Sequence, residues 1–343
     1  MRTLTASIVA CAFVGCAGAA RPSAARPELR AELARVAASI DGEVAIAIVD
    51  LATGAEVHVN GETPMPQQST FKLWLAVAVA DAVERGEVSW DTEVRIEPEQ
   101  LTFPYQPIAD EVGEGRAFTL AELVGWILLV SDNPSADAIL RALGGTDAVE
   151  AALRRRGIEG VRITTGEEGL HAMADRLRGE TDSMGEAEAR AHLRAALARD
   201  PNGATALGAA RGLARLARGE LLDPASTERL IRHLTETETG AARLRGGLPE
   251  GWSVAHKTGT GPDLRGVGLG TNDVGVIRAP DGQRWAVAVF IAGTTAAPAD
   301  REARIADVAR AVVASHRARS TSAAIHRAKT STLGERSSGK ARR

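Results

Sequence analysis

Ser69 and Lys72 are the first residues along the chain whose types and spacing suit nucleophilic chemistry. They lie three apart at the start of the segment 71–85, which is apolar on nearly every side and is therefore predicted to be a buried helix. Residues three apart share one helix face, and the free N–H groups at a helix start favour a developing anion. A lysine buried there could accept the proton of the serine hydroxyl. Taken alone, however, the pair is better explained as a helix-capping serine followed by an ordinary lysine.

The scarcity of lysine changes that judgement. The chain has 41 Lys and Arg residues, but only four of them are lysines. Lys72 and Lys257 fall in the expected folded body, whereas Lys329 and Lys340 fall in a C-terminal tail. Arginine cannot give up its proton, and its planar guanidinium needs more room than an ammonium. The two body lysines therefore mark positions where arginine cannot substitute.

A second triplet, Ser131-Asp132-Asn133, follows the apolar helical segment 120–130. Ser131 could pass a proton to a departing nitrogen, and the amide of Asn133 could hold a substrate carbonyl. Ser, Asp and Asn followed by Pro134 are also what a helix start uses. Taken alone, this triplet is better explained as a capping loop.

A third triplet, Lys257-Thr258-Gly259, lies in a strand-like run that continues through Thr260. The missing side chain at Gly259 would let a ligand lie against the strand. The hydroxyls of Thr258 and Thr260 could bind a carboxylate beside the charge of Lys257. The plainer explanation is an edge strand that fades into a glycine-rich loop.

The three triplets in this order match the set shared by class A β-lactamases and penicillin-binding proteins. From about Leu29 to His316 the chain resembles a class A β-lactamase. Tyr105-Gln106-Pro107-Ile108 resembles the aromatic gate beside the site of that family. Two other runs resemble the segment before its Lys-Thr-Gly strand and its last hairpin: Glu236 to Leu244, and Asn272 to Ile277 with Pro280-Asp281-Gly282.

The resemblance implies a carboxylate that activates water against an acyl ester. In the run Gly166 to His171, Glu167 takes that position on a loop, and His171 follows four residues later, as in one extended-spectrum branch of the class. Glu168 is the competing assignment, one residue out of register. Two surface glutamates in a loop would be the plainer explanation, which the flanking triplets disfavour.

The remaining roles follow from the same resemblance. Ser69 would attack the lactam carbonyl, and the N–H groups of Ser69 and Thr260 would form the oxyanion hole. Either Lys72, or Glu167 through a water, would take the serine proton. The implied catalytic residues are Ser69, Lys72, Ser131, Glu167 and Lys257, and the implied substrate-binding residues are Tyr105, Asn133, His171, Arg243, Thr258, Gly259 and Thr260. Arg243 is expected to bind the carboxylate of the drug, with Arg265 as the less favoured candidate.

Two features depart from the family pattern. Thr165 stands where many members carry an arginine that clamps the loop around Glu167. The segment 175–202 is also longer than the family needs, by roughly twenty residues. It would either reshape the entrance of the site or form a surface excursion.

The function expected from the resemblance is β-lactam hydrolysis by serine acylation and Glu-assisted deacylation, with small-molecule β-lactams as substrates. The alternatives are a D-Ala-D-Ala peptidase of the penicillin-binding type and a β-lactam sensor without turnover. No metal, cofactor or obligate protein partner is expected. The net charge of −3 gives no reason to expect nucleic acid as a partner.

The two ends of the chain are expected to lie outside the catalytic domain. Residues 1–24 read as a signal peptide, because a short apolar run follows Arg2 and gives way to small residues. Phe13-Val14-Gly15-Cys16 resembles a lipoprotein cleavage box, with plain cleavage near Ala19 as the alternative. A bacterial periplasmic or secreted protein is therefore expected, with membrane attachment only through a lipid on Cys16. Residues 317–343 read as a disordered basic tail.

The expected fold class is α+β, arranged as an α/β/α sandwich. Strand patterns lie near both ends of the body, and almost purely helical patterns lie between them. This order predicts one antiparallel sheet built from both chain ends, with the terminal helices packed on it and an all-α domain inserted. The catalytic domain is predicted to span 25–316, with its α/β part at 25–65 and 245–316 and its all-α part at 66–244.

Overall fold

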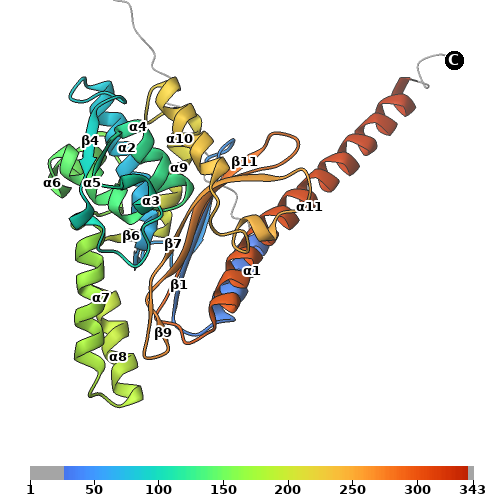
Figure 1. The fold of residues 1–343 in the computed structure, drawn as a ribbon. Coiled ribbons are helices and arrows are strands. Elements are labelled where there is room, and N and C mark those ends of the chain that lie inside the picture. Colours follow the sequence, from blue (N-terminus) through green and yellow to red (C-terminus); the bar gives the residue numbers. More distant parts are fainter. Residues whose placement is uncertain (1–26, 339–343) are drawn as a thin grey trace, which may run out of the picture.

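A five-stranded antiparallel sheet connects the two ends of the folded body (Figure 1). The structure is a computed structural model that describes residues 27–338. The sheet order is β2-β1-β11-β10-β7, and the strands are β1 (Glu43–Asp50), β2 (Glu56–Val59), β7 (Ser253–Thr260), β10 (Thr271–Arg278) and β11 (Arg284–Ala292). The expected α+β fold with a sheet from both chain ends is confirmed.

Strand β1 shows how the sequence assigns the two faces of this sheet. Its large residues Val44, Ile46 and Ile48 belong to the apolar cluster shared with the terminal helices. The alternate positions Ala45, Ala47 and Val49 belong to the cluster shared with the helical domain. Side chains alternate between faces along a strand, so helices can cover the sheet on both sides (Figure 1).

The terminal helices α1 (Pro27–Ala38) and α11 (Pro298–Ser338) pack on the first of these faces. The structure differs from expectation in the length of α11, which continues to Ser338 instead of ending at His316. The apolar spacing stops at His316, whose ring packs against Trp252 and Trp285. Beyond it the chain is rich in Ala, Arg, Ser and Thr and contains no proline, so nothing in the sequence interrupts the helix before Ser338. That extension projects from the body in Figure 1.

The helical domain surrounds α2 (Phe71–Glu84), whose first twelve residues are all buried. A helix that is apolar on every side has no face for water, which is why it lies at the centre of the domain. The other helices of this domain are α3 (Ala109–Val112), α4 (Leu120–Leu129), α5 (Asn133–Leu143), α6 (Thr146–Arg155), α7 (Glu167–Thr181), α8 (Glu186–Leu197), α9 (Ala206–Arg218) and α10 (Pro224–Glu236). Two short strand pairs complete it: β3 (Pro64–Pro66) with β6 (Gly203–Thr205), and β4 (Glu93–Ile96) with β5 (Arg116–Thr119).

In the part of the chain that the structure describes, none of the helices combines the length and the apolar character needed to cross a membrane. The expected signal peptide at 1–24, with its lipidation site at Cys16, lies outside the described residues, as do residues 339–343 of the basic tail.

Candidate active site

Ser69 lies in a single 3₁₀ turn, η1 (Gln68–Thr70), that leads directly into α2. Gln68 has a φ of 46°, in the left-handed region, where a residue other than glycine is uncommon. The same turn explains Gly259 on β7. A Cβ at Gly259 would lie 2.6 Å from the Gln67 carbonyl oxygen and 3.0 Å from the Thr70 nitrogen. The sequence suggested that Gly259 makes room for a ligand, but the space beside it holds the backbone of the serine turn.

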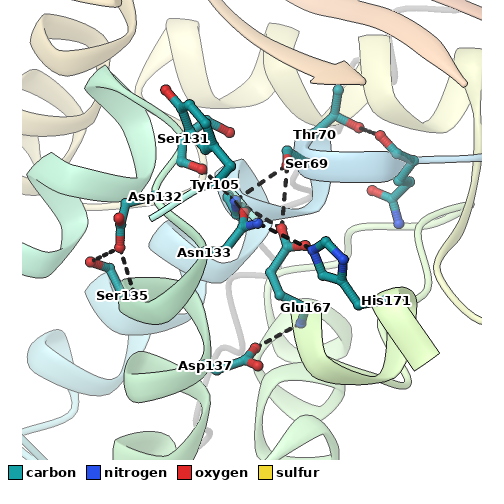
Figure 2. A network of polar contacts seen from close by, with 12 residues as sticks. Ser69, Thr70, Tyr105, Ser131, Asp132, Asn133, Ser135, Asp137, Glu167 and His171 are labelled. Atoms are coloured by element: carbon teal, nitrogen blue, oxygen red, sulfur yellow. Dashed lines mark hydrogen bonds and ion pairs between the residues drawn. The ribbon is translucent and has the colours of Figure 1, made fainter. Parts of the chain in front are cut away.

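The ammonium of Lys72 lies at the centre of the site and is completely buried. Its Nζ lies 2.8 Å from Glu167 Oε1 and 3.2 Å from Ser69 Oγ. It also donates to the Ser131 carbonyl and to Asn133 Oδ1, each at 2.6 Å. The Ser69 hydroxyl in turn donates to Glu167 Oε1 at 3.3 Å, and Figure 2 shows Ser69, Asn133 and Glu167 lying close together. The nucleophile therefore has two candidate proton acceptors within reach.

Ser131 connects the two lysines. Its φ of 66° is left-handed, and its carbonyl accepts from Lys72 while its Oγ accepts from Lys257 Nζ at 2.8 Å. The turn is held by Asp132, whose carboxylate caps α5 by accepting from the Ser135 N–H and hydroxyl. Asp132 therefore caps the helix, as the plainer explanation of the triplet expected. Ser131 occupies the position expected of a residue that transfers a proton.

Lys257 is also completely buried, on β7. Besides Ser131 Oγ, its Nζ donates to the Thr258 carbonyl at 2.9 Å. Burial, together with the nearby charge of Lys72, holds the pKa of the Lys257 ammonium well below its usual range. A lysine in this state can return a proton to the Ser131 hydroxyl more readily than an exposed one.

Glu167 is the first residue of α7, where the sequence had suggested a loop. Its backbone N–H and that of Glu168 donate to the two oxygens of Asp137, at 2.7 and 2.9 Å. Asp137 lies on α5, and burial raises the pKa of its carboxyl. A carboxylate at a helix start is the favoured arrangement. Glu167 is 5% exposed and points to Ser69, whereas Glu168 is exposed, so the geometry favours Glu167 as the base.

Asn202 holds the segment before Glu167, where Thr165 stands at the position at which the resemblance implied an arginine. Its Oδ1 accepts from the N–H groups of Thr164 and Thr165, at 2.9 and 3.2 Å. Its Nδ2 donates to the Thr165 carbonyl at 2.9 Å. Sequence analysis missed both Asp137 and Asn202. The one available signal was that Asp137 lies four residues after Asn133 and therefore on the same helix face.

Asp200 helps to position Asn202, because its Oδ1 accepts from the Asn202 N–H at 2.8 Å. Burial raises the pKa of Asp200 from 3.8 to about 6, and its Oδ2 has no partner among the described residues. The folded protein therefore holds this proton more tightly than the unfolded chain, and stability is lost as the pH rises through the folded-state pKa.

Replacing Asp200 by Asn is therefore expected to stabilise the protein above pH 6. A difference of about two pKa units corresponds to roughly 3 kcal/mol at most. The gain should vanish below pH 4, where Asp200 is as neutral as the amide. Thermal unfolding from pH 4 to 8 measures this, with Asp182→Asn as the control at an exposed carboxylate. A gain that is independent of pH would contradict the explanation.

His171 and Tyr105 lie at the entrance of the site (Figure 2). His171 follows Glu167 by one turn of α7, and its Nε2 lies 3.3 Å from Asn133 Nδ2 and 3.9 Å from Glu167 Oε2. Its ring packs against Phe103, with the ring centroids 5.4 Å apart. Tyr105 is 48% exposed, and its hydroxyl donates to the Val130 carbonyl at 2.8 Å. Both side chains are thus partly open to solvent beside the buried catalytic groups.

Arg243 lies beside β7, and only 5% of its surface is exposed. Its guanidinium donates to the carbonyls of Gly259 and Asn272, at 3.1 and 2.9 Å, and to Thr260 Oγ1 at 2.7 Å. These bonds hold the end of β7 and leave Arg243 next to the Thr260 hydroxyl. Arg265, the less favoured candidate for the carboxylate, instead donates to the Met184 carbonyl at 3.0 Å. The Thr258 hydroxyl pairs with that of Thr239 at 2.7 Å.

The structure thus brings the five expected catalytic side chains together in one site, from η1, α2, the turn before α5, α7 and β7. Among residues 27–320, whose side chains the structure describes, no group of His, Asp and Glu has an arrangement that could hold a metal ion.

Comparison with known proteins agrees with this geometry. Residues 28–315 match the model of the β-lactamase enzyme family. β-Lactamase VEB-1 and the extended-spectrum β-lactamase PER-1, both from Pseudomonas aeruginosa, are 28% identical to the chain. The alignments cover 79% and 84% of the chain and 84% and 87% of the two relatives. The crystal structure of a β-lactamase from Chitinophaga pinensis is 31% identical, with a TM-score of 0.71 over 83% of this chain and 97% of that one. With this match across almost the whole folded body, the chain belongs to the class A β-lactamases.

Proposed function

We propose that Ser69 is the nucleophile that opens the β-lactam ring and that Glu167 drives hydrolysis of the resulting ester. The observation that carries this proposal is the position of Glu167 Oε1, which lies 2.8 Å from Lys72 Nζ and 3.3 Å from Ser69 Oγ inside a buried site. One carboxylate can therefore serve both the attack of the serine and the later attack of water.

In acylation, the Ser69 oxygen bonds to the lactam carbonyl carbon, and its proton passes to Lys72 or, through a water, to Glu167. The oxyanion forms opposite the N–H groups of Ser69 and Thr260, and such donors contribute roughly 3–4 kcal/mol each. The carbon–nitrogen bond then breaks, and the nitrogen takes the proton of the Ser131 hydroxyl. Lys257, at 2.8 Å, returns a proton to Ser131, and the proton first taken from Ser69 then replaces the one that Lys257 gave, so that Glu167 enters deacylation as a carboxylate.

In deacylation, Glu167 takes a proton from a water while the water oxygen bonds to the ester carbonyl carbon. The ester bond breaks, and the proton returns to Ser69. His171 Nε2 lies 3.9 Å from Glu167 Oε2 and 3.3 Å from Asn133 Nδ2, so these two side chains can orient that water and the amide of the substrate. The substrates are small-molecule β-lactams, and their hydrolysis would confer antibiotic resistance.

We also propose that the enzyme is exported to the periplasm or the medium of a bacterium. The support is the apolar segment after Arg2 and the small residues that follow it. Cys16 is the site at which a lipid would attach the enzyme to a membrane.

Turnover of a chromogenic cephalosporin by the purified domain tests the proposed function. We expect sustained hydrolysis, and we expect Ser69→Ala to lower kcat by roughly 10⁴-fold or more, because the nucleophile is lost. A single burst, in which the amount of cephalosporin opened equals the amount of enzyme, would instead indicate a penicillin-binding peptidase or a sensor. Ser135→Ala, which alters a nearby serine whose hydroxyl donates only to the capping carboxylate of Asp132, is the matched control.

A further inference from the structure

A cavity of about 650 Å³ lies between helices α9 and α10 and the first half of strand β7. Figure 1 shows both helices beside the sheet. None of the residues that line this cavity belongs to the expected catalytic or substrate-binding set. Sites for small molecules typically measure roughly 300–1,000 Å³, so the cavity is a candidate for a second binding site.

The wall of the cavity is mainly apolar. The sheet contributes Ala255 of β7 and Val276 of β10, which are both buried. The helices contribute Ala217 of α9 and Ile231 of α10, which pack against the same apolar cluster. These four side chains form no hydrogen bonds, but they can pack against a hydrocarbon and exclude water from it. A ligand that fits this wall therefore has an apolar part.

Two arginines face each other at the edge of this wall. Arg278 of β10 and Arg284 of β11 are direct partners in the register of the two strands, and both line the cavity. Arg278 lies on the same face as Val276, because side chains alternate along a strand. Like charges that lie directly opposite each other destabilise a pair of strands. An anion bound between the two guanidiniums would offset this repulsion.

A third arginine, Arg218 at the end of α9, also lines the cavity. Its guanidinium donates to the carbonyls of Leu51 and Asp50, at 2.9 and 3.3 Å, and that of Arg284 donates to the Ala217 carbonyl at 2.8 Å. These carbonyls hold the two guanidiniums in place. Among the described residues, however, neither guanidinium forms an ion pair with a carboxylate.

The charge of the cavity is not balanced by its own residues. Arg278 is exposed, and no hydrogen bond or ion pair joins its guanidinium to another residue in the described part of the chain. Glu228 is the one carboxylate in the lining, so three guanidiniums against one carboxylate give a formal charge of +2. Guanidinium groups bind oxyanions through pairs of N–H groups. The ligand that complements this edge is therefore an anion.

We propose that this cavity binds an amphipathic anion with a single apolar chain, of the class of medium-chain carboxylates. The head group lies between Arg278 and Arg284, and the chain packs on Ala255 and Val276. A neutral apolar molecule would leave the guanidiniums without an anion, and a small polar anion would leave the apolar wall uncovered. This inference goes beyond the proposed hydrolysis and does not depend on it.

The cavity is separate from the position expected to bind the carboxylate of a drug. Ser253 and Ala255, in the first half of β7, line the cavity. Thr260 ends the same strand five residues after Ala255, which is roughly 17 Å along an extended chain. An anion in the cavity is therefore distinguishable from one in the catalytic site by substitution at either end of the strand.

Isothermal titration calorimetry with decanoate tests the proposal. We expect one molecule to bind per protein with a Kd on the order of 10⁻⁴ M, a modest affinity for a ligand of this size. Decyltrimethylammonium has the same chain with the opposite charge and should not bind, and neither should acetate. Arg278→Ala should raise the Kd for decanoate about tenfold, because a hydrogen-bonded charge is lost. The variant should unfold at the wild-type temperature, since the Arg278 guanidinium has no partner among the described residues.

Arg232→Ala is the matched control, because it removes an exposed arginine of α10 that does not line the cavity. It should leave the Kd for decanoate unchanged, and so should Thr260→Val. Absence of decanoate binding to the wild type would overturn the proposal, as would equal Kd values for the wild type and Arg278→Ala. Equal binding of decanoate and decyltrimethylammonium would also overturn it. Weaker binding to Thr260→Val would do the same, because decanoate would then occupy the catalytic site.

Discussion

Glu167→Gln enzyme is expected to react with a β-lactam and then remain acylated. The amide preserves the shape of the side chain, but it cannot accept a proton from water. Loss of a general base in this position lowers the rate roughly 10²–10⁴-fold. Acylation should persist, because Lys72 remains 3.2 Å from the Ser69 hydroxyl. Intact mass spectrometry should therefore detect one bound drug molecule per protein for minutes to hours, whereas the wild type returns to its free mass.

Glu168→Gln is the control for this experiment, since the Glu168 side chain is exposed and its backbone N–H still reaches Asp137. It should turn over at the wild-type rate. If Glu168→Gln stalls as the acyl-enzyme and Glu167→Gln does not, the base is one residue further along the chain than the geometry indicates.

Lys72→Arg is expected to lower the acylation rate by roughly 10³-fold or more, comparable to the loss of other essential groups in a catalytic unit. The Lys72 ammonium bonds four oxygens in a fully buried space. A guanidinium keeps the charge, but it cannot take the serine proton and is larger than an ammonium. Single-turnover kinetics measure the acylation rate. Thermal unfolding shows whether the variant is still folded, and so distinguishes slow acylation from a loss of folded protein.

Lys257→Arg is the comparison variant, because Lys257 donates to Ser131 Oγ and not to the nucleophile, so this change leaves Lys72 in place as the proton acceptor for Ser69. We expect it to lose less acylation rate than Lys72→Arg. Equal losses in two stably folded variants would show that Lys72 acts through its charge and not as a proton acceptor.

The sequence predicts those parts of the molecule that depend on local pattern. The alternation in β1 assigns its faces correctly because large and small residues alternate with the pleat. The apolar surface of α2 predicts its central position. The scarcity of lysine directs attention to Lys72 and Lys257 without any structure, because arginine cannot replace lysine in proton transfer.

The sequence does not show which residues brace the site, because those contacts join distant segments. Asn202 holds Thr165 from 37 positions away, and Asp137 holds the start of α7 from 30 positions away. The two glutamates between Gly166 and Gly169 suggested a loop, but the carboxylate of Asp137 caps them as a helix start. Arg265 likewise gains its partner, the Met184 carbonyl, only from the fold.

The most direct measurement is the position of the acyl group in Glu167→Gln enzyme treated with a penicillin and digested for peptide mapping. The account predicts a single modified peptide that contains Ser69, with no label on the peptides of Ser131 or Lys257. A stable adduct on any other residue, or no adduct while the variant still destroys the drug, would contradict it.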